Sequence, residues 1–147
     1  MLPTTACPVV LRRRGCLEIL VFRHPLAGVQ LVKGSLEPGE CSAVAAVREL
    51  AEEAGVQGVA SGALGVWDAG FAGQVWAFHQ CRAAALPDTW RHQCADDGGH
   101  EFSFFWHPLA SPPSAEWHPL FQGALAFVRQ QLEGREVDGC GALPERY

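Results

Sequence analysis

The sequence lacks several features that would place it in common protein classes. Its 147 residues contain no run of 18 or more apolar side chains, so no segment is expected to span a membrane. The first residues, MLPTTACPVVLRRRG, lack a basic start followed by an apolar block and do not resemble a secretory signal. Basic residues are a minority, because 11 Lys and Arg against 16 Asp and Glu give a formal net charge of −5. That balance argues against stable nucleic-acid binding, although a metal ion or a local arginine cluster could still hold a small phosphorylated ligand.

Cysteine patterns typical of zinc sites are also absent. No CxxC pair and no Cys/His cluster occurs. Scattered cysteines of this kind are typical of reduced thiols in a cytoplasmic protein, where most act as small core residues. The six are Cys7, Cys16, Cys41, Cys81, Cys94 and Cys140.

Length and composition fit one domain. A chain of 147 residues with 48% hydrophobic residues can bury one substantial core. We expect this domain to occupy residues 1–133. The glycine-rich, polar segment 134–147 is expected to be a loosely ordered tail.

Hydrophobic patterns predict strands that alternate with two helices. The first helix is predicted from Ser42, as N-cap, to Ala54, with Gly55 as its C-terminal cap. The second lies within residues 111–134, where one apolar face is formed by Leu120, Ala124, Phe127, Val128 and Leu132. Strands are predicted at 7–14, 16–24, 29–32, 62–71, 74–83 and 101–109, with loops at 33–40 and 86–100. This order favours an α/β fold, a mixed sheet with helices packed on its faces.

The first helix has an unusual charge distribution. At 100° per residue, its glutamates gather on one side and its larger apolar residues on the other. We therefore expect the apolar side to be buried and the carboxylates to be presented outward. The apolar side consists of Val44, Val47, Leu50, Ala51 and Ala54, and the acidic side of Glu49, Glu52 and Glu53.

The three carboxylates are unfavourable for the helix itself. Pairs such as Glu49 and Glu53 repel each other by roughly 0.2–0.5 kcal/mol, and the negative end of the helix dipole disfavours them further. Arg48 is the one nearby cation. A bound divalent cation accounts for the cluster better than a solvated helix face does, and oxygen ligands favour Mg²⁺, with Mn²⁺ as a second choice.

The spacing of the segment resembles a known motif. From Gly34 it reads Gly, five residues, Glu40, seven residues, Arg48-Glu49-Leu50, one residue, Glu52-Glu53, one residue, Gly55-Val56. This resembles the Nudix box of the Nudix hydrolases at each defined position. The resemblance implies an α/β/α sandwich with a mixed sheet, and hydrolysis of a nucleoside diphosphate derivative by attack of water at phosphorus.

The resemblance also implies roles for the box residues. Glu49, Glu52 and Glu53 would hold catalytic Mg²⁺, with the Gly34 carbonyl as a possible further ligand. Arg48 would orient Glu49, and Glu40 would pair with Arg48 and fix the loop to the helix.

The general base is not settled by the motif. Glu53 is one choice, and Glu101 is another because many relatives carry a glutamate at about this place. His100, next to Glu101, could do the same work.

Residues outside the box are the expected substrate contacts. Lys33 and Arg23 could bind phosphate, His24 could face the pocket, and Trp90 could stack on a base. Three subfamily markers are missing: the proline of ADP-ribose hydrolases, the tyrosine of diadenosine polyphosphate hydrolases and the coenzyme A signature. The sequence thus predicts a Mg²⁺-dependent hydrolase of a nucleoside triphosphate or dinucleoside polyphosphate. The alternative is a non-catalytic Nudix-fold module that senses a nucleotide, and the oligomeric state stays open.

Overall fold

The protein is a single mixed sheet with one helix on each face. The computed structural model describes residues 1–95 and 98–138. In chain order the elements are β1 (Thr5–Arg14), β2 (Cys16–His24), β3 (Gly28–Gln30), β4 (Gly34–Ser35), α1 (Ser42–Ala54), β5 (Gly58–Asp68), β6 (Val75–Ala83), β7 (Trp90–Cys94), β8 (His100–Pro108) and α2 (Pro119–Asp138).

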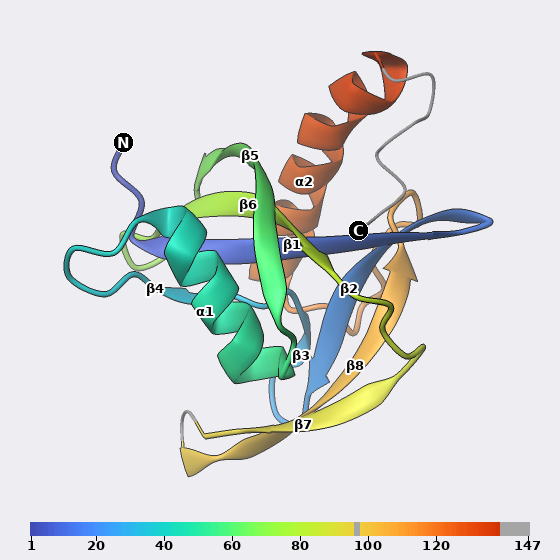
Figure 1. The fold of residues 1–147 in the computed structure, drawn as a ribbon, viewed down its shortest axis with the longest axis horizontal. Coiled ribbons are helices and arrows are strands. Elements are labelled where there is room, and N and C mark those ends of the chain that lie inside the picture. The colour runs from blue at the N-terminus through green and yellow to red at the C-terminus, as the bar shows by residue number, and fades with distance from the viewer. Residues whose placement is uncertain (96–97, 139–147) are drawn as a thin grey trace.

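The sheet contains both parallel and antiparallel pairs. Its strand order is β5-β6-β1-β2-β8-β7, with β3 paired to β2 and β4 to β1. β1 and β6 run parallel, while β2 pairs antiparallel with both β1 and β8. Figure 1 shows α1 in front of this sheet and α2 behind it. The predicted α/β/α arrangement with a mixed sheet is therefore confirmed.

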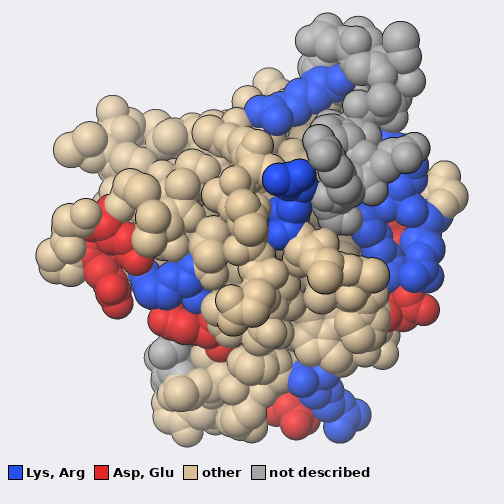
Figure 2. Space-filling view, viewed as in Figure 1, with Lys and Arg blue, Asp and Glu red and all other residues tan. Residues whose placement is uncertain are grey.

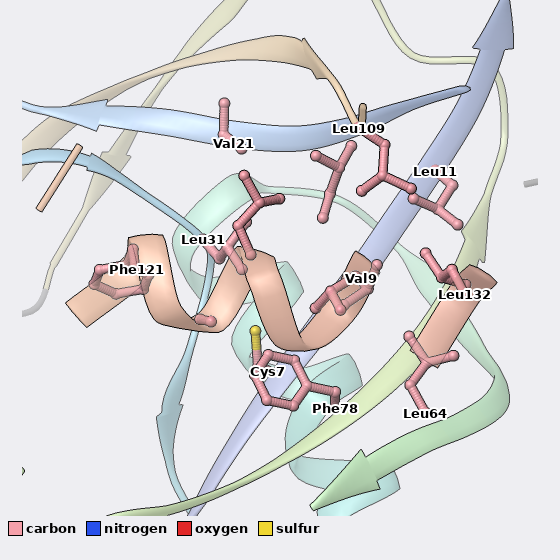
Figure 3. Close-up of a cluster of buried hydrophobic side chains, with 14 of the residues drawn as sticks. Cys7, Val9, Leu11, Val21, Leu31, Leu64, Phe78, Leu109, Phe121 and Leu132 are labelled. Atoms are coloured by element: carbon pink, nitrogen blue, oxygen red, sulfur yellow. The ribbon is translucent and has the colours of Figure 1, made fainter. Parts of the chain in front are cut away.

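The central strands are buried on both faces, which explains their nearly continuous apolar sequences. In β1, Cys7, Val9 and Leu11 belong to the core on the α2 side. The alternate residues Ala6 and Val10 belong to the core on the α1 side. Figure 3 shows part of the α2-side core, where Phe121 and Leu132 of α2 reach toward side chains of the strands. The predicted hairpin around Gly15 is present, with Arg14 opposite Cys16.

α1 has the predicted bounds, but two details of the prediction are wrong. Its N-cap is Cys41, whereas Ser42 is the first helical residue and its hydroxyl lies 2.7 Å from His79 Nε2. The buried side is also shifted around the helix, since Val44 is 57% exposed. The residues that face the sheet are Ala45, Ala46, Glu49, Leu50 and Ala54.

The small alanines explain this shift. Ala45 and Ala46 are fully buried, and their short side chains let the helix backbone approach the sheet closely. Glu49 follows on the same side and is carried into the protein with them, at 6% exposure. The prediction favoured valine over alanine as a buried residue, and it therefore chose the wrong side of the helix as the buried one.

The predicted loop 86–100 is also partly wrong, because it contains β7. The polar residues of β7 concealed its alternation, in which Trp90 and Cys94 pack toward the α1-side core. α2 continues to Asp138, beyond the domain boundary predicted at residue 133. The rest of the predicted tail, 139–147, lies outside the described residues, as does Cys140.

The described part of the chain can be examined for disulfides and for helices that could span a membrane. Its five cysteines, Cys7, Cys16, Cys41, Cys81 and Cys94, form no disulfide. None of the helices in residues 1–95 and 98–138 is long and apolar enough to cross a membrane.

Candidate active site

Gly34, the first residue of the box, and Glu49 are in direct contact. Gly34 lies in β4 and pairs with Ala6 of β1, while Glu49 lies on the sheet-facing side of α1. The Glu49 carboxylate fills the space that a Cβ atom at position 34 would occupy. The glycine is therefore required by this close approach, which holds the Glu49 carboxylate against the backbone of the loop.

Arg48 connects the loop to the helix. Its Nε and Nη2 atoms donate to both Glu40 oxygens at 2.8 Å. Nη1 donates to Glu49 at 2.8 Å and to Glu52 at 3.2 Å, and Nη2 also donates to the Ser35 carbonyl at 3.0 Å. The bonds from Arg48 to Glu40 and Glu49 are those that the resemblance implied. Figure 2 shows acidic groups on either side of a basic one over α1 and the loop before it.

The charges of this network change its titration. The guanidinium of Arg48, followed by the backbone N–H of Glu37, lowers the pKa of Glu40 from 4.5 to about 2. The hydrogen bond to Glu40 in turn raises the pKa of Arg48 above its usual value. Both groups therefore stay ionised at neutral pH and lock the loop to the helix through a two-point, charge-assisted bond.

A cavity of about 710 Å³ lies beside this network. Its volume is within the range typical of small-molecule sites. Its lining includes charged groups from the box and the residue before it, namely Lys33, Arg48, Glu49 and Glu53, together with Gly34. It also includes Phe22 and His24 of β2, Gln30 of β3 and Phe102 of β8. The cavity thus combines charged groups that suit a phosphate with aromatic side chains.

Several residues of the predicted site do not line this cavity. Arg23 pairs with Glu116, packs over Phe105 and lines a separate cavity of about 410 Å³. Trp90 lines that second cavity as well. Trp90 lies in β7, where its indole N–H donates to the Ala54 carbonyl at 3.0 Å and its ring stacks on Phe104.

Glu101 is also outside the cavity. Its side chain is 55% exposed and its carboxylate lies 3.8 Å from Arg91. Because side chains alternate along β8, Glu101 points away from the face that carries Phe102, a cavity-lining residue. Its neighbour His100 shares the face of Phe102, and its ring lies 4.9 Å from that of His24.

The cavity residues that were not identified from the sequence include Phe22, Gln30 and Phe102. The strand alternation could have revealed Phe102, since it shares a face with His100. Gln30 carried no such signal, because its place depends on the pairing of the short β3 with the end of β2.

The box glutamates do not form a ready cation cage. Within the part of the chain that the structure describes, no three acidic, histidine or cysteine side chains are grouped closely enough to hold a metal ion. Arg48 donates to both Glu49 and Glu52 and keeps their carboxylates on its own side. A metal held by Glu49, Glu52 and Glu53 together therefore requires a change in these side chains.

The sheet between two helices, with the box helix beside a polar cavity, is the architecture of a Nudix protein. The chain belongs to the Nudix hydrolase family, since the family model described as NUDIX domain matches residues 1–125. No curated protein matches the chain.

Solved structures share the fold at low sequence identity. An ADP-ribose pyrophosphatase from Streptococcus suis is 16% identical with a TM-score of 0.62, over 88% of this chain and 91% of that one. A UDP-X diphosphatase is 14% identical with a TM-score of 0.65, over 92% of this chain and 65% of that one. A pyrophosphohydrolase from Bacillus subtilis is 19% identical with a TM-score of 0.62, over 90% and 82%. The chain is similar to these proteins in fold.

Proposed function

We propose that this Nudix hydrolase cleaves a phosphoanhydride bond of a nucleoside diphosphate derivative, either a nucleoside triphosphate or a dinucleoside polyphosphate. The observation that carries the proposal is the cavity lined both by the charged Lys33, Glu49 and Glu53 and by the aromatic Phe22, His24 and Phe102. A diphosphate needs charged partners, and a nucleoside can stack on aromatic side chains. The solved structures named above are all enzymes of diphosphate or pyrophosphate chemistry by their descriptions.

The residues fit a divalent cation, Mg²⁺ or Mn²⁺. Their donors are carboxylate oxygens, which such cations prefer, and the contact of Glu49 with Gly34 brings a carboxylate next to the loop backbone. Glu49, Glu52, Glu53 and the Gly34 carbonyl would hold the ion. When bound, the ion would neutralise charge on the phosphate oxygens and lower the pKa of a bound water.

The chain's own groups supply the remaining chemistry. Lys33 lines the cavity and can pair with a substrate phosphate. Glu53 also lines it, whereas Glu101 lies outside, and this supports Glu53 as the carboxylate that would take the proton from the attacking water. Arg48 holds Glu49 in place through its bonds to Glu40 and the loop.

A substrate panel tests this function. The purified protein should be incubated with Mg²⁺ and nucleoside triphosphates, dinucleoside polyphosphates, ADP-ribose or a UDP-sugar, and the products identified by mass spectrometry. Reaction in ¹⁸O-labelled water should place the label on a phosphate-containing product, which shows attack at phosphorus. Loss of the reaction in excess chelator and its return with Mg²⁺ or Mn²⁺ complete the test.

Two other outcomes would change the proposal. Nucleotide binding without any product would favour the alternative, a sensing module. Label on a product that contains no phosphate would mean attack at carbon. A cytoplasmic location, based on the cysteine pattern, and a small-molecule nucleotide as the partner remain parts of the same proposal.

A further inference from the structure

The last turn of α1 carries Glu52 and Glu53, and its carbonyl groups need partners. The last four carbonyls of a helix have no partner within the helix. Gly55, in a left-handed conformation, donates its N–H to the Ala51 carbonyl at 3.0 Å. This cap leaves the carbonyls of Glu52 and Ala54 beyond its reach.

β7 supplies donors to both of these carbonyls. The Trp90 indole N–H donates to Ala54 at 3.0 Å, and His92 Nε2 lies 3.1 Å from the Glu52 carbonyl oxygen. Because a carbonyl only accepts, Nε2 of His92 must carry the hydrogen. Two side chains of one strand therefore bind the end of the box helix.

Packing holds both donors in place. The Trp90 ring is stacked on Phe104, with centroids 5.1 Å apart and an angle of 9°. The His92 ring covers Gly55, where a Cβ atom would lie 2.7 Å from its Nδ1. Neither donor can move far without disturbing β8 or the helix cap.

We propose that Trp90 and His92 are positioning residues for the metal-binding end of α1. No basic residue lies in the last turn of this helix, and Arg48, one turn earlier, contacts the Glu49 and Glu52 side chains and not the terminal carbonyls. The two N–H groups oppose the partial charge of the carbonyls and prevent the last turn from fraying. Glu52 and Glu53 can then meet Mg²⁺ from a fixed backbone. This role rests on the proposed function.

A pair of matched variants tests the inference. Trp90→Phe removes one indole N–H and keeps a stacked ring. Trp106→Phe removes an equivalent bond, the donation from Trp106 to the Pro87 carbonyl at 3.0 Å, in the same core cluster but away from α1. Each variant is titrated with Mg²⁺ while its melting temperature and its turnover are followed separately.

The expected result is a selective loss of metal affinity. Trp90→Phe should raise the Mg²⁺ concentration for half-maximal thermal stabilisation about tenfold, the lower end of what losing an outer partner of a metal site causes. Trp106→Phe should leave that concentration unchanged. His92→Leu should behave like Trp90→Phe, and His92→Gln, which keeps an N–H donor, should recover most of the affinity.

The outcomes separate this inference from the proposed function. If the parent responds to Mg²⁺ and both tryptophan variants keep its midpoint, or shift it equally, the positioning role is overturned. If the parent shows no Mg²⁺ response in melting or turnover, the proposed function itself is overturned, and this role with it.

Discussion

The two helices pack on the same sheet in different ways. α2 buries large apolar side chains on its face of the sheet, including Phe121, Leu125 and Leu132. α1 buries mainly alanines, one leucine and the carboxyl-bearing Glu49. An apolar contact of the first kind gives stability in proportion to the area it buries. α1 is held in addition by hydrogen bonds, from Arg48 in its middle to the loop and from β7 to its last turn. The α2 side of the sheet therefore contributes mainly apolar packing, whereas the α1 side mainly fixes the geometry of the candidate site.

Removing the acidic group nearest the chemistry should have the largest effect. Glu53→Gln should lower turnover by about 10²- to 10⁴-fold, the range for loss of a positioned proton acceptor. The metal-free variant should be as stable as the parent or more stable by up to about 0.5 kcal/mol, because one like-charge pair is lost. Turnover and chelator-treated melting curves check both. Glu37→Gln, in the same cavity wall but exposed, is the control, and equal turnover in both variants would contradict the assignment.

Truncating one buried leucine on each side of the sheet should show that stability and metal binding depend on different sides. Leu125→Ala and Leu50→Ala each empty a fully buried site and should lower the free energy of unfolding by about 2–5 kcal/mol. Only Leu50→Ala should also raise the Mg²⁺ midpoint, because it loosens α1. Denaturant unfolding with and without Mg²⁺ measures both quantities. A shifted midpoint in Leu125→Ala would show that the faces are not independent.

Replacing the connecting arginine should weaken the site without emptying the core. Arg48→Lys keeps the charge but cannot make the two-point bond to Glu40 together with the bonds to Glu49 and Ser35. Turnover should fall about 10- to 100-fold, as for other outer partners of metal ligands. Steady-state kinetics at saturating Mg²⁺ provide the measurement. Parental turnover in this variant would remove Arg48 from the mechanism.

The contribution of the Glu40–Arg48 pair to the free energy of unfolding should depend on pH. Since the pKa of Glu40 falls from 4.5 to about 2 on folding, its stabilising contribution is complete above pH 4.5 and is lost as the pH falls toward 2. The parent and Glu40→Gln should therefore differ most at neutral pH and converge in strong acid. Unfolding curves from pH 7 to 2 test this, with the substitution of the exposed Glu133 on α2, Glu133→Gln, as the control. A constant difference down to pH 2 would contradict it.

The smallest effect is expected at Glu101. Its carboxylate lies outside the cavity, next to Arg91 at 3.8 Å. Glu101→Gln should change turnover by less than about twofold, far below the loss expected for a general base. A fall of 100-fold at saturating substrate would return Glu101 to the mechanism. His100→Gln should be measured beside it, because His100 lies on the other face of β8, which carries the cavity residue Phe102.

The spacing of the box allowed the helix, its partners and the family to be predicted from sequence, because a contiguous motif fixes its own geometry. The pairing of Arg48 with Glu40, which the resemblance to the Nudix box implied, is present in the structure. The cavity wall could not be predicted in this way. Arg23 and His24 are adjacent in sequence, yet strand alternation sends only His24 into the cavity. Trp90 looked like a loop residue because β7 is short and polar, and its partner carbonyl lies on a distant helix.

The parallel pairing of β1 with β6 has a consequence for the order of folding. Thr4 and Val75, which bond to each other where these strands meet, are 71 positions apart in the chain. The whole box segment, from Gly34 to Val56, lies inside the loop that this pairing closes. Closing a long loop carries an entropic penalty before any contact is gained, and such non-local topologies fold slowly. A chain that ends before residue 75 therefore contains the complete box but lacks β6, β7 and β8, and with them Phe102 of the cavity.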